Sequence, residues 1–598
     1  MTTEPTANLY QEDLPDVCEL LKIKTQKLAR KETLLNTFPL LRWLPKYKLK
    51  FLLQDFVAGL TVGLTTIPQA IAYGVVAGLP PQYGLYSAFM GCFVYIFFGT
   101  CKDITVGPTA IMALMVQQHA TASADFVVLA CFLSGCVILL MGILNMGFLI
   151  QFISMPVTIG FSTAAALTIG SGQVNNLFGI KNSSNAFLAS WQNFFTNISH
   201  ARLYDSLLGV GTLILLLCMR KVKDIKSLNK FVTKYVSLSR NALAVIIGAV
   251  LAYCLTHDGY TPFKLSGQIT PGLPPFQLPP FSTNVNGTAY SFTEMIVELG
   301  SSVGSIPLIA ILESIAIAKT FSKGKTIDAS QEMIALGLCN VMGSFVSSMP
   351  TTGSFTRTAI NNASGVKTTL GGAITGGLVL MALAFLTTTF YYIPKATLAA
   401  IIIAAMIFMV EVEKIHDLWK AKKIDFIPFL VTLLCCLFWS LEYGILCGVA
   451  LNLVFVLYAS ARPKITISVQ KISGVEVAVV QVFSNLKYSS AEYLRSKVIK
   501  FVNEQFGRVA VVIISGEEIF SIDSTVAVNI LSMKEELSMI GCELICWKWN
   551  YCAAGVVCRL KPEAQSMFKF TETKEEVILD QMRSQNGNST AIATNQVP

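Results

Sequence analysis

Apolar runs that are long enough to cross a membrane recur along the first 460 residues of this chain. The runs at residues 126–150 and 370–386 reach or approach the roughly 20 residues that a helix needs to cross about 30 Å of hydrocarbon. Because 53% of all residues are hydrophobic and only 14% are charged, the chain is far more apolar than a water-soluble globular protein. The sequence therefore predicts a polytopic α-helical membrane protein.

The Gly, Pro and charged residues that interrupt these runs divide them into about fourteen segments. The segments form two groups of seven, and because seven is odd, the second group crosses the membrane with the opposite topology. Together they predict a transmembrane domain over residues 55–460. The segments are expected near 55–78, 84–100, 107–120, 126–149, 157–178, 205–220 and 241–257, then near 293–318, 330–346, 354–364, 370–390, 395–411, 425–440 and 443–460.

Lys and Arg, which are enriched in short cytoplasmic loops, cluster after the sixth, eighth and twelfth segments. These loops lie on one side of the membrane if the segments alternate, and the long loop 258–292 on the opposite side contains only Lys264. Residues 1–54 contain no apolar core before Phe51, so no cleavable secretory signal is evident there. We therefore expect a cytosolic N-terminal region over residues 1–54 and a cytosolic C-terminus.

Three sequons lie in loops on the side opposite these basic clusters, beginning at Asn182, Asn197 and Asn286. Because that side is the one exposed to the glycosylation machinery, N-glycosylation is expected there.

Many of the 15 cysteines lie inside apolar segments and lack the spacing of metal ligands. We interpret these as packing residues: Cys92, Cys131, Cys136, Cys218, Cys435 and Cys436. The chain has no Walker sequence and no nucleophile with a positioned base. We therefore expect no enzymatic activity, no cofactor, no bound metal and no nucleic-acid partner.

The composition changes after residue 462 to the alternating strand-like and amphipathic stretches of a soluble α/β domain, expected over residues 463–583. Strands are expected at 475–483, 509–514 and 543–547, and helices at 491–505 and 525–540, with 566–582 closing the domain. The polar tail 584–598 is expected to be disordered.

The third segment of each group is short and interrupted. Residues 103–114 and 348–360 each contain a β-prone stretch, then Gly107 or Gly353, then the start of a helix. Pro108 suits a first helical turn and Ser354 suits an N-cap. Because lipid cannot satisfy free amide groups, irregular backbone at membrane depth must be buried in protein or line a cavity.

Two such breaks in halves of opposite topology are typical of a transporter whose substrate site lies near the middle of the bilayer. The two half-helix N-termini would point toward each other, each supplying about half a positive charge and unpaired N–H donors. The sequence therefore predicts an anion between them.

Two charged residues occur at membrane depth, where an unpaired guanidinium costs about 3 kcal/mol. Arg357 lies close to the second N-terminus and favours an anion, unless it faces the cytosol or pairs structurally with Glu313. Glu313 either couples transport to protonation or neutralises a neighbouring cation.

Gln69 and Tyr73 interrupt the first segment and, four residues apart, share one helical face. Both side chains suit weak anion binding without a full charge. Helix–helix contact for Gln69 and packing for Tyr73 remain the alternative.

The chain resembles the solute carrier 26 sulfate permease family over nearly its whole length. The motifs that carry the resemblance are residues 55–60, Ile67-Pro68-Gln69-Ala70, residues 77–87, Gly107-Pro108-Thr109-Ala110 and Thr352-Gly353-Ser354-Phe355-Thr356-Arg357. The resemblance implies a seven-plus-seven inverted repeat with a core domain that moves and a gate domain that does not. It also implies a homodimer, formed through the gate domain and a C-terminal STAS domain.

The same resemblance implies that the site residues come from the first, third and tenth segments: Gln69, Tyr73, Thr109, Ala110, Ser354, Phe355, Thr356 and Arg357. In the C-terminal domain, Asp523 and Ser524 lie in the loop whose serine is phosphorylated in small bacterial relatives. The usual following glycine is absent here, so an interaction role is favoured over a phosphoswitch.

The function implied is sodium-independent exchange of sulfate for chloride, bicarbonate, oxalate or a similar anion, by alternating access. The protein is expected in the plasma membrane or the lysosomal membrane, in contact with membrane lipids. Two alternatives stay open: a channel-like chloride conductance on the same scaffold, and an organic-anion permease.

Overall fold

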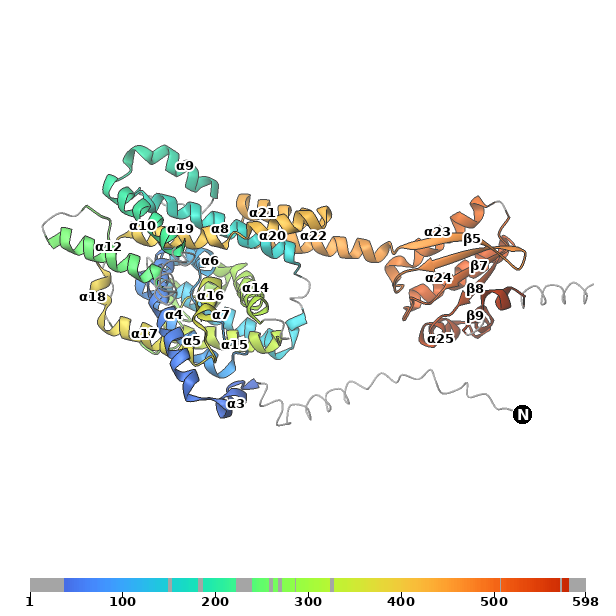
Figure 1. Ribbon diagram of the computed structural model, residues 1–598, viewed down its shortest axis with the longest axis horizontal. Helices are drawn as coiled ribbons and strands as arrows, with labels where there is room; N and C mark the ends of the chain where they lie inside the picture. The colour runs from blue at the N-terminus through green and yellow to red at the C-terminus, as the bar shows by residue number, and fades with distance from the viewer. Residues whose placement is uncertain are drawn as a thin grey trace, which may run out of the picture. The chain divides into compact units, whose positions relative to one another are not determined.

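The computed structural model describes residues 37–148, 153–180, 187–221, 239–257, 262–266, 272–285, 287–322, 327–505, 507–570 and 573–579. Two of the sequon residues, Asn182 and Asn286, lie outside these ranges, as do residues 1–36 and the tail 584–598. The chain divides into two compact units, one ending at Ala450 and the other beginning at Leu451 (Figure 1).

The first seven membrane segments follow the predicted order. A short helix α3 (Leu40–Trp43), a 3-10 turn η1 (Leu44–Lys46) and, later, α9 (Phe187–Asn197) with η3 (Ile198–His200) are additional to them. The segments are α4 (Leu49–Val76), α5 (Pro81–Phe98), β1 (Val106–Gly107) with α6 (Ala110–Ala120), α7 (Ala124–Ile143), α8 (Met155–Leu177), α10 (Leu203–Lys221) and α12 (Arg240–His257).

The second seven segments repeat the pattern, again with a short strand and a half-helix in third place. They are α14 (Ser302–Phe321), α15 (Ala329–Ser344), β4 (Thr352–Gly353) with α16 (Phe355–Ser364), α17 (Gly371–Phe385), α19 (Lys395–Met409), α21 (Phe426–Phe438) and α22 (Leu441–Ala461). The hairpin β2 (Thr283–Val285) and β3 (Thr288–Tyr290), the helices α13 (Phe292–Leu299), α18 (Thr387–Phe390) and α20 (Val412–Ala421), and η5 (Lys423–Asp425) lie between them.

The expected segment 293–318 is not one helix. It is divided into α13 and α14 at Gly300, whose backbone has a φ of 49° that L-residues rarely adopt. Within the described ranges, seven helices are long and apolar enough to cross a membrane by length and composition alone. Of the other spanning segments, α5 and α8 have 18 and 23 residues but are less apolar, and the rest are shorter. The two half-helices α6 and α16 are shortest because their first halves are extended backbone.

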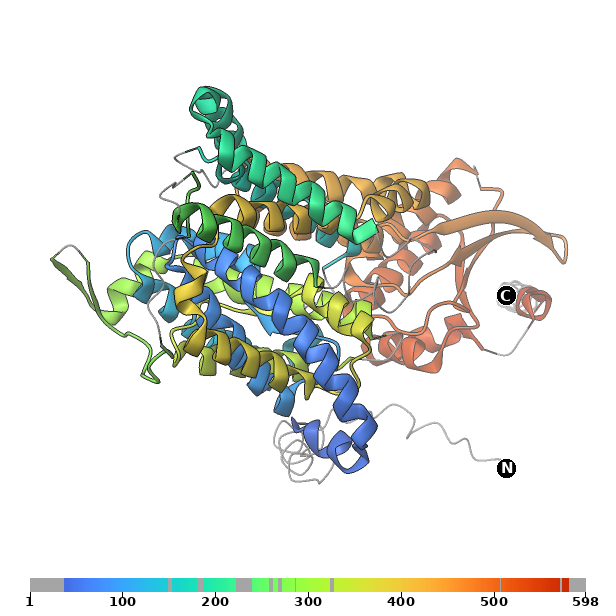
Figure 2. The same cartoon turned by 60° about the vertical axis from the view of Figure 1, so that its left-hand side comes forward.

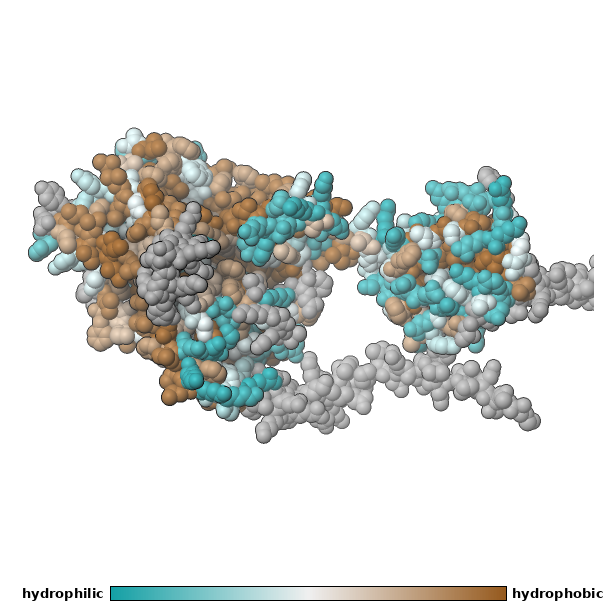
Figure 3. Space-filling model, in the orientation of Figure 1, coloured by the Kyte–Doolittle hydropathy of each residue, from teal (hydrophilic) through white to brown (hydrophobic). Residues whose placement is uncertain are grey.

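The helices of this unit pack in two sets. The first set contains α4, α5, α7, α14, α15 and α17 with the half-helices, and the second contains α8, α10, α12, α19 and α21. These sets correspond to the predicted core and gate domains. Much of the face seen in Figure 3 is hydrophobic over this unit, and α10 and α12 expose large apolar side chains such as Leu207 and Ile246. Such a surface is suited to lipid.

The cysteines of the apolar segments are free thiols in varied settings. Cys92, Cys131 and Cys436 are buried, Cys136 and Cys435 are half-buried, and Cys218 is exposed. Packing therefore describes the first three, while Cys218 lies on the outer surface of α10. No group of three or more His, Cys, Asp or Glu side chains in the described residues could hold a metal ion.

The C-terminal unit is the predicted α/β domain. Its sheet has the order β5-β6-β7-β8-β9, with β5 antiparallel to β6 and the remaining neighbours parallel. The strand β5 and the helix α25 were not predicted from the sequence. The elements are β5 (Ile465–Ile472), β6 (Val475–Val482), α23 (Tyr488–Glu504), β7 (Val511–Ser515), α24 (Ser524–Met539), β8 (Glu543–Trp547), α25 (Tyr551–Leu560), η6 (Pro562–Met567) and β9 (Phe568–Lys569).

Candidate anion-binding site

The two half-helices are joined through a two-stranded antiparallel sheet. Val106 of β1 lies opposite Gly353 of β4, and Gly107 lies opposite Thr352. Because each strand continues directly into its half-helix, α6 and α16 leave this sheet in opposite directions. The two N-termini therefore lie on either side of one small sheet, which confirms the predicted arrangement of the half-helices.

Thr109 is the N-cap of α6, and its hydroxyl accepts from the main-chain N–H of Met112 at 3.4 Å. The sequence had suggested that Pro108 lies in the first turn of this helix. The helix begins at Ala110, so Pro108 instead precedes the N-cap. A proline disfavours the helical conformation of the residue before it, so Pro108 favours the extended backbone of Gly107 in β1.

Ser354 is the N-cap of α16, as predicted, but its hydroxyl makes no capping hydrogen bond. Its side-chain oxygen lies 3.3 Å from the hydroxyl of Thr356, which is half-buried. The first N–H groups of a helix have no acceptor within the helix. At α16 they are left without the side-chain cap that would occupy one of them, so an anion can take that place.

Arg357 is the third residue of α16, and its side chain is 0% exposed. Its Nη1 donates to the carbonyl oxygen of Pro108 at 2.8 Å, which ties α16 to the chain just before α6. Its Nε and Nη2 find no hydrogen-bond partner among the described residues. A buried cation with two unused donors is unfavourable unless a ligand or counter-charge reaches it.

The two other interpretations of Arg357 do not agree with this geometry. Complete burial is incompatible with a guanidinium that faces the cytosol. In the part of the chain that the structure describes, Arg357 forms no direct salt bridge with Glu313, although the two groups are close enough for their charges to interact. Its one hydrogen bond is to a main-chain carbonyl. The side chain therefore spans the gap between the half-helices.

Gln69 and Tyr73 lie in α4 with 2% and 3% of their surface exposed. The Oε1 of Gln69 is buried without a partner in the described residues. Tyr73 lies close enough to Arg357 and Glu313 to interact with both charges. Because α4 packs against both half-helices, these side chains form a third wall beside the two N-termini.

Glu313 is a half-buried residue of α14, and its Oε2 accepts from the hydroxyl of Thr109 at 3.4 Å. The N-cap of α6 therefore links the first half-helix to this carboxylate. The next residue, Ser314, has a buried hydroxyl without a partner among the described residues and lies against Gly353. The sequence did not single out Ser314, whose only signal is its position beside a carboxylate at membrane depth.

The extended backbone before α16 is held by Asn340, a fully buried residue of α15. Its Oδ1 accepts from the N–H of Thr351 at 2.7 Å, and its Nδ2 donates to the carbonyl of the same residue at 2.9 Å. This pair of bonds replaces the ladder partners that a longer strand would supply. Sequence reasoning missed Asn340, although a lone amide inside an apolar segment was a signal for it.

The far end of α16 is held by two aspartates. Asp103 accepts from the side-chain amide of Asn362 at 3.1 Å, while Asp55 accepts from the N–H groups of Lys367 and Thr368 at 2.7 and 3.1 Å. Tyr47, which precedes α4, donates to Asp55 at 3.2 Å, and its burial beside that carboxylate raises the pKa of the phenol to about 12. The half-helix is therefore fixed at both ends.

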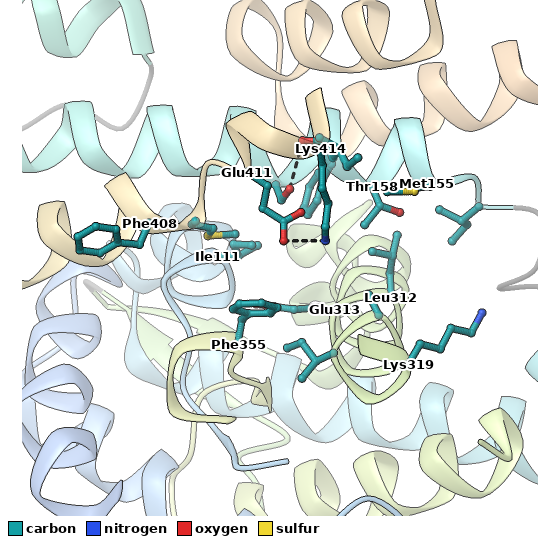
Figure 4. Close-up of a pocket in the computed structure, with 17 residues that line it drawn as sticks. Ile111, Met155, Thr158, Leu312, Glu313, Lys319, Phe355, Phe408, Glu411 and Lys414 are labelled. Carbon is teal, nitrogen blue, oxygen red and sulfur yellow. Dashed lines mark hydrogen bonds and ion pairs between the residues drawn. The ribbon is translucent and has the colours of Figure 1, made fainter. Parts of the chain in front are cut away.

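A cavity of about 480 Å³ opens beside this site, between the two sets of helices. Figure 4 shows Glu313 and Phe355 on the side of α14 and α16, facing Thr158 of α8 and the ion pair of Glu411 with Lys414. The Nζ of Lys414 lies 2.7 Å from the Oε1 of Glu411. The rest of the wall is mainly apolar, with Ile111, Phe161, Leu312 and Met409 among its residues.

Of the predicted site residues, Phe355 and Glu313 line this cavity, and Phe355 packs against Phe321 with ring centroids 5.4 Å apart. The other predicted residues are not part of this wall, and they belong to α4 and to the N-terminal ends of the two half-helices. They are Gln69, Tyr73, Thr109, Ala110, Ser354, Thr356 and Arg357. The gate-side residues Thr158, Glu411 and Lys414 were not predicted, because nothing local in the sequence shows which segments face the site.

The remaining predicted residues belong to other elements than those that form the anion site. Asn197 is the last residue of α9, and its amide donates to the Oδ1 of Asn193 at 2.6 Å. Asp523 is the N-cap of α24, accepting from Val526 N at 2.9 Å, and Ser524 is the exposed first residue of that helix. Asp523 therefore has a structural role in the C-terminal unit.

Comparison with known families matches residues 52–432 to the model described as the sulfate permease family. Curated relatives give the same result. The chain is 43% identical over 527 residues to the bovine (Bos taurus) protein named sodium-independent sulfate anion transporter, covering 86% of each chain. It is 33% identical to high affinity sulfate transporter 2 of Stylosanthes hamata, covering 78% of this chain and 73% of the relative.

Among solved structures, the fold is similar to that of the murine solute carrier 26 family member A9 anion transporter in its inward-facing state. The TM-score is 0.81, with 94% of this chain and 98% of that chain covered, at 19% identity. At this identity the likeness shows the fold alone. It confirms the arrangement of the membrane segments and the attached α/β domain.

Proposed function

The chain belongs to the sulfate permease family, and from this membership and the site geometry we propose that it is a sodium-independent secondary transporter that exchanges sulfate for chloride, bicarbonate or a similar anion. The observation that supports an anion most strongly is Arg357. Two nitrogens of its buried side chain, Nε and Nη2, have no partner among the described residues, and they lie beside two helix N-termini. An anion accepts from these donors and also complements the positive charge of the guanidinium and the helix ends.

The charge of the site matches a dianion in magnitude. Two helix N-termini supply about half a positive charge each, and Arg357 supplies one more, so an anion experiences about two positive charges. Sulfate carries two negative charges and accepts hydrogen bonds on four oxygens. Main-chain donors from α6 and α16 and the guanidinium of Arg357 can therefore replace much of its hydration shell.

The net positive charge near the site depends on whether the carboxyl group of Glu313 is ionised or protonated. When its carboxylate is ionised, it lowers the net charge near the site to about one, which suits chloride or bicarbonate. When it is protonated, the full charge is available to sulfate. We therefore include Glu313 in the proposal as the group that couples sulfate entry to a proton.

Alternating access is supported by the position of the cavity. Its walls come from both sets of helices, so a displacement of one set against the other opens or closes it. Lys319 and Lys414 lie at this cavity, and basic residues mark the cytosolic side. The proposal therefore has the cavity open to the cytosol and both termini on the cytosolic side. An epitope tag at the C-terminus tests this orientation, because antibody should reach the tag only after the cells are permeabilised.

The proposal extends to a homodimer in the plasma or lysosomal membrane, with oxalate as a further exchange anion and Asn197 as a glycosylation site. The homodimer, its membrane and oxalate depend on the family resemblance, whereas glycosylation of Asn197 depends on its sequon and on the loop in which it lies.

Uptake of radiolabelled sulfate into liposomes containing the purified protein tests the function. We expect internal chloride or bicarbonate to stimulate uptake at least about fivefold over an impermeant internal anion, with no requirement for sodium. A current without obligatory exchange would contradict exchange and favour a chloride channel. Strong competition by dicarboxylates with weak transport of sulfate would favour an organic-anion permease.

The same assay tests the role of Glu313. Acidification should raise sulfate uptake by the unaltered protein, because protonation removes a negative charge beside a dianion. In Glu313→Gln this stimulation should disappear, and uptake should be high at all pH values. Persistence of the full pH response in the variant would remove Glu313 from the coupling mechanism.

A further inference from the structure

The connection between α12 and α13 contains a tandem repeat that the anion site does not use. Leu273-Pro274-Pro275-Phe276-Gln277 is followed at once by Leu278-Pro279-Pro280-Phe281-Ser282. We call residues 272–282 the proline segment. Three of its apolar side chains are mostly exposed: 58% for Leu273, 68% for Phe276 and 70% for Leu278. So much exposed apolar surface in a short connection indicates a partner.

The first repeat is attached to the end of α15. The N–H of Gln277 donates to the carbonyl oxygen of Phe345 at 2.9 Å, and the ring of Phe276 stacks on that of Phe345 with centroids 5.5 Å apart. Phe345 follows Ser344, the last residue of α15. The proline segment therefore supplies a donor to one of the carbonyls that a helix leaves unpaired at its C-terminus.

The C-terminal end of α15 lies beside the N-terminal part of the neighbouring helix α7. Gly135 of α7 packs against Val341 and Gly337, and Gly142 packs against Ile334 and Ser330, so the two helices run antiparallel. Extending this register places Phe345 beside the first two turns of α7. The proline segment contacts Phe345 and therefore also lies beside the first two turns of α7.

The second repeat gives a separate measure of depth. The ring of Phe281 packs edge-on against Phe132, with centroids 5.7 Å apart. Phe132 lies eight residues after Ala124, where α7 begins, so at about 1.5 Å per residue it lies about 12 Å along the helix axis. Because α7 is long and apolar enough to cross a membrane, this contact places the second repeat alongside the N-terminal half of that helix and not beyond its end.

The chain then returns to the end of the helix. Thr283 donates to the Oδ2 of Asp125 at 2.6 Å, in the first turn of α7. The following hairpin of β2 and β3 projects away from the helices at the left of Figure 2. The proline segment is thus the part of this connection that descends along the helices, while the hairpin is the part that leaves them.

We propose that the proline segment lies in the boundary layer between lipid head groups and acyl chains, with Leu273, Phe276 and Leu278 in contact with phospholipid. Proline is suited to this place because it has no N–H to leave unpaired, and four of the segment's residues are prolines. The polar amide of Gln277 is tolerated in that layer but not in the bilayer centre.

The segment also has a structural purpose. Residues 345–351 between α15 and β4 are not helical, and irregular backbone is not stable where it faces the hydrocarbon core of the bilayer. By covering Phe345, the proline segment shields the start of this stretch, which leads to Thr351 and the anion site.

Photo-cross-linking of the full-length protein in phosphatidylcholine liposomes tests the proposal. A diazirine amino acid replaces Leu278 in one variant, Phe276 in a second and Ala289 in a matched control, since Ala289 is an exposed residue of the hairpin. Mass spectrometry then measures the adducts. We expect about tenfold more phospholipid adduct at positions 278 and 276 than at 289, because water consumes the reagent at a solvated site.

Equal and low phospholipid adduct at all three positions would overturn the proposal and place the segment in water. A cross-link from position 278 to a second copy of the chain would also overturn it, and would make the segment a subunit contact. Each variant is first shown to give a monodisperse protein in detergent, so that misfolded material does not enter the comparison.

Discussion

Replacing Arg357 with glutamine is expected to lower the apparent affinity for sulfate by at least about a hundredfold. Hydrogen bonds to a charged group contribute about 1.5–3 kcal/mol each, and two nitrogens of Arg357 are available to donate to the anion. One bond from each therefore contributes about 3 kcal/mol or more, and about 1.4 kcal/mol corresponds to a tenfold change in affinity. Concentration dependence of sulfate uptake in liposomes measures the effect. Arg357→Lys should fall in between, because it keeps the charge without the planar fork.

The matched control is Lys319→Gln, which removes a cation from the cavity wall where the side chain is exposed. Its effect should remain within about twofold, since exposed charges are screened by water and salt. Thermal unfolding separates function from folding. Sulfate should raise the melting temperature of the unaltered protein and not that of Arg357→Gln. Equal losses in both variants, or unchanged sulfate affinity in Arg357→Gln, would remove Arg357 from the site.

Adding one methyl group at Gly107 is expected to lower sulfate affinity by about tenfold. A Cβ on Gly107 would lie 3.1 Å from the Nη2 of Arg357, closer than ordinary packing allows. Forcing extra volume into a packed core costs about 1–3 kcal/mol, and here the group that must shift is the guanidinium itself. Sulfate uptake by Gly107→Ala, compared at equal amounts of protein, measures the effect.

Gly353 provides the control on the partner strand of the same two-stranded sheet. A Cβ there would meet Ser314 at 3.4 Å, which is ordinary van der Waals contact. Gly353→Ala should therefore change sulfate affinity by no more than about twofold. If both variants lose the same activity, the effect belongs to the sheet as a whole and the contact with Arg357 is not its cause.

The membrane segments could be predicted from the sequence because burial in lipid demands long apolar runs, and the breaks at Gly107 and Gly353 interrupt those runs visibly. The break at Gly300 could not be predicted from the sequence. A single glycine inside an apolar run is compatible with a continuous helix, and only its φ of 49° ends α13. The short helix α9 was missed for a related reason, since it lies in a loop and not in a spanning run.

The candidate site could be predicted in its residues but not in its contacts. Helix breaks and Arg357 pointed to an anion, yet the bond from Arg357 to Pro108 joins residues 249 positions apart. The hydrogen bonds from the side chain of Asn340 to the main chain of Thr351 depend on how α15 is aligned with the extended stretch before α16. No local sequence pattern predicts that alignment. In the C-terminal unit, β8 was predicted with its observed bounds because it is an apolar β-prone run, whereas β5 alternates exposed polar residues and follows α22 closely.

The central claim is that the transported anion binds between the N-termini of α6 and α16 against Arg357. The most direct measurement is a structure determined in selenate, an isostere of sulfate whose selenium is located by its anomalous scattering. The account predicts a peak within hydrogen-bond distance of the Nε or Nη2 of Arg357 and of main-chain N–H groups in the first turns of both half-helices. A peak confined to Lys319 and Lys414 at the cavity wall, with none at Arg357, would contradict it.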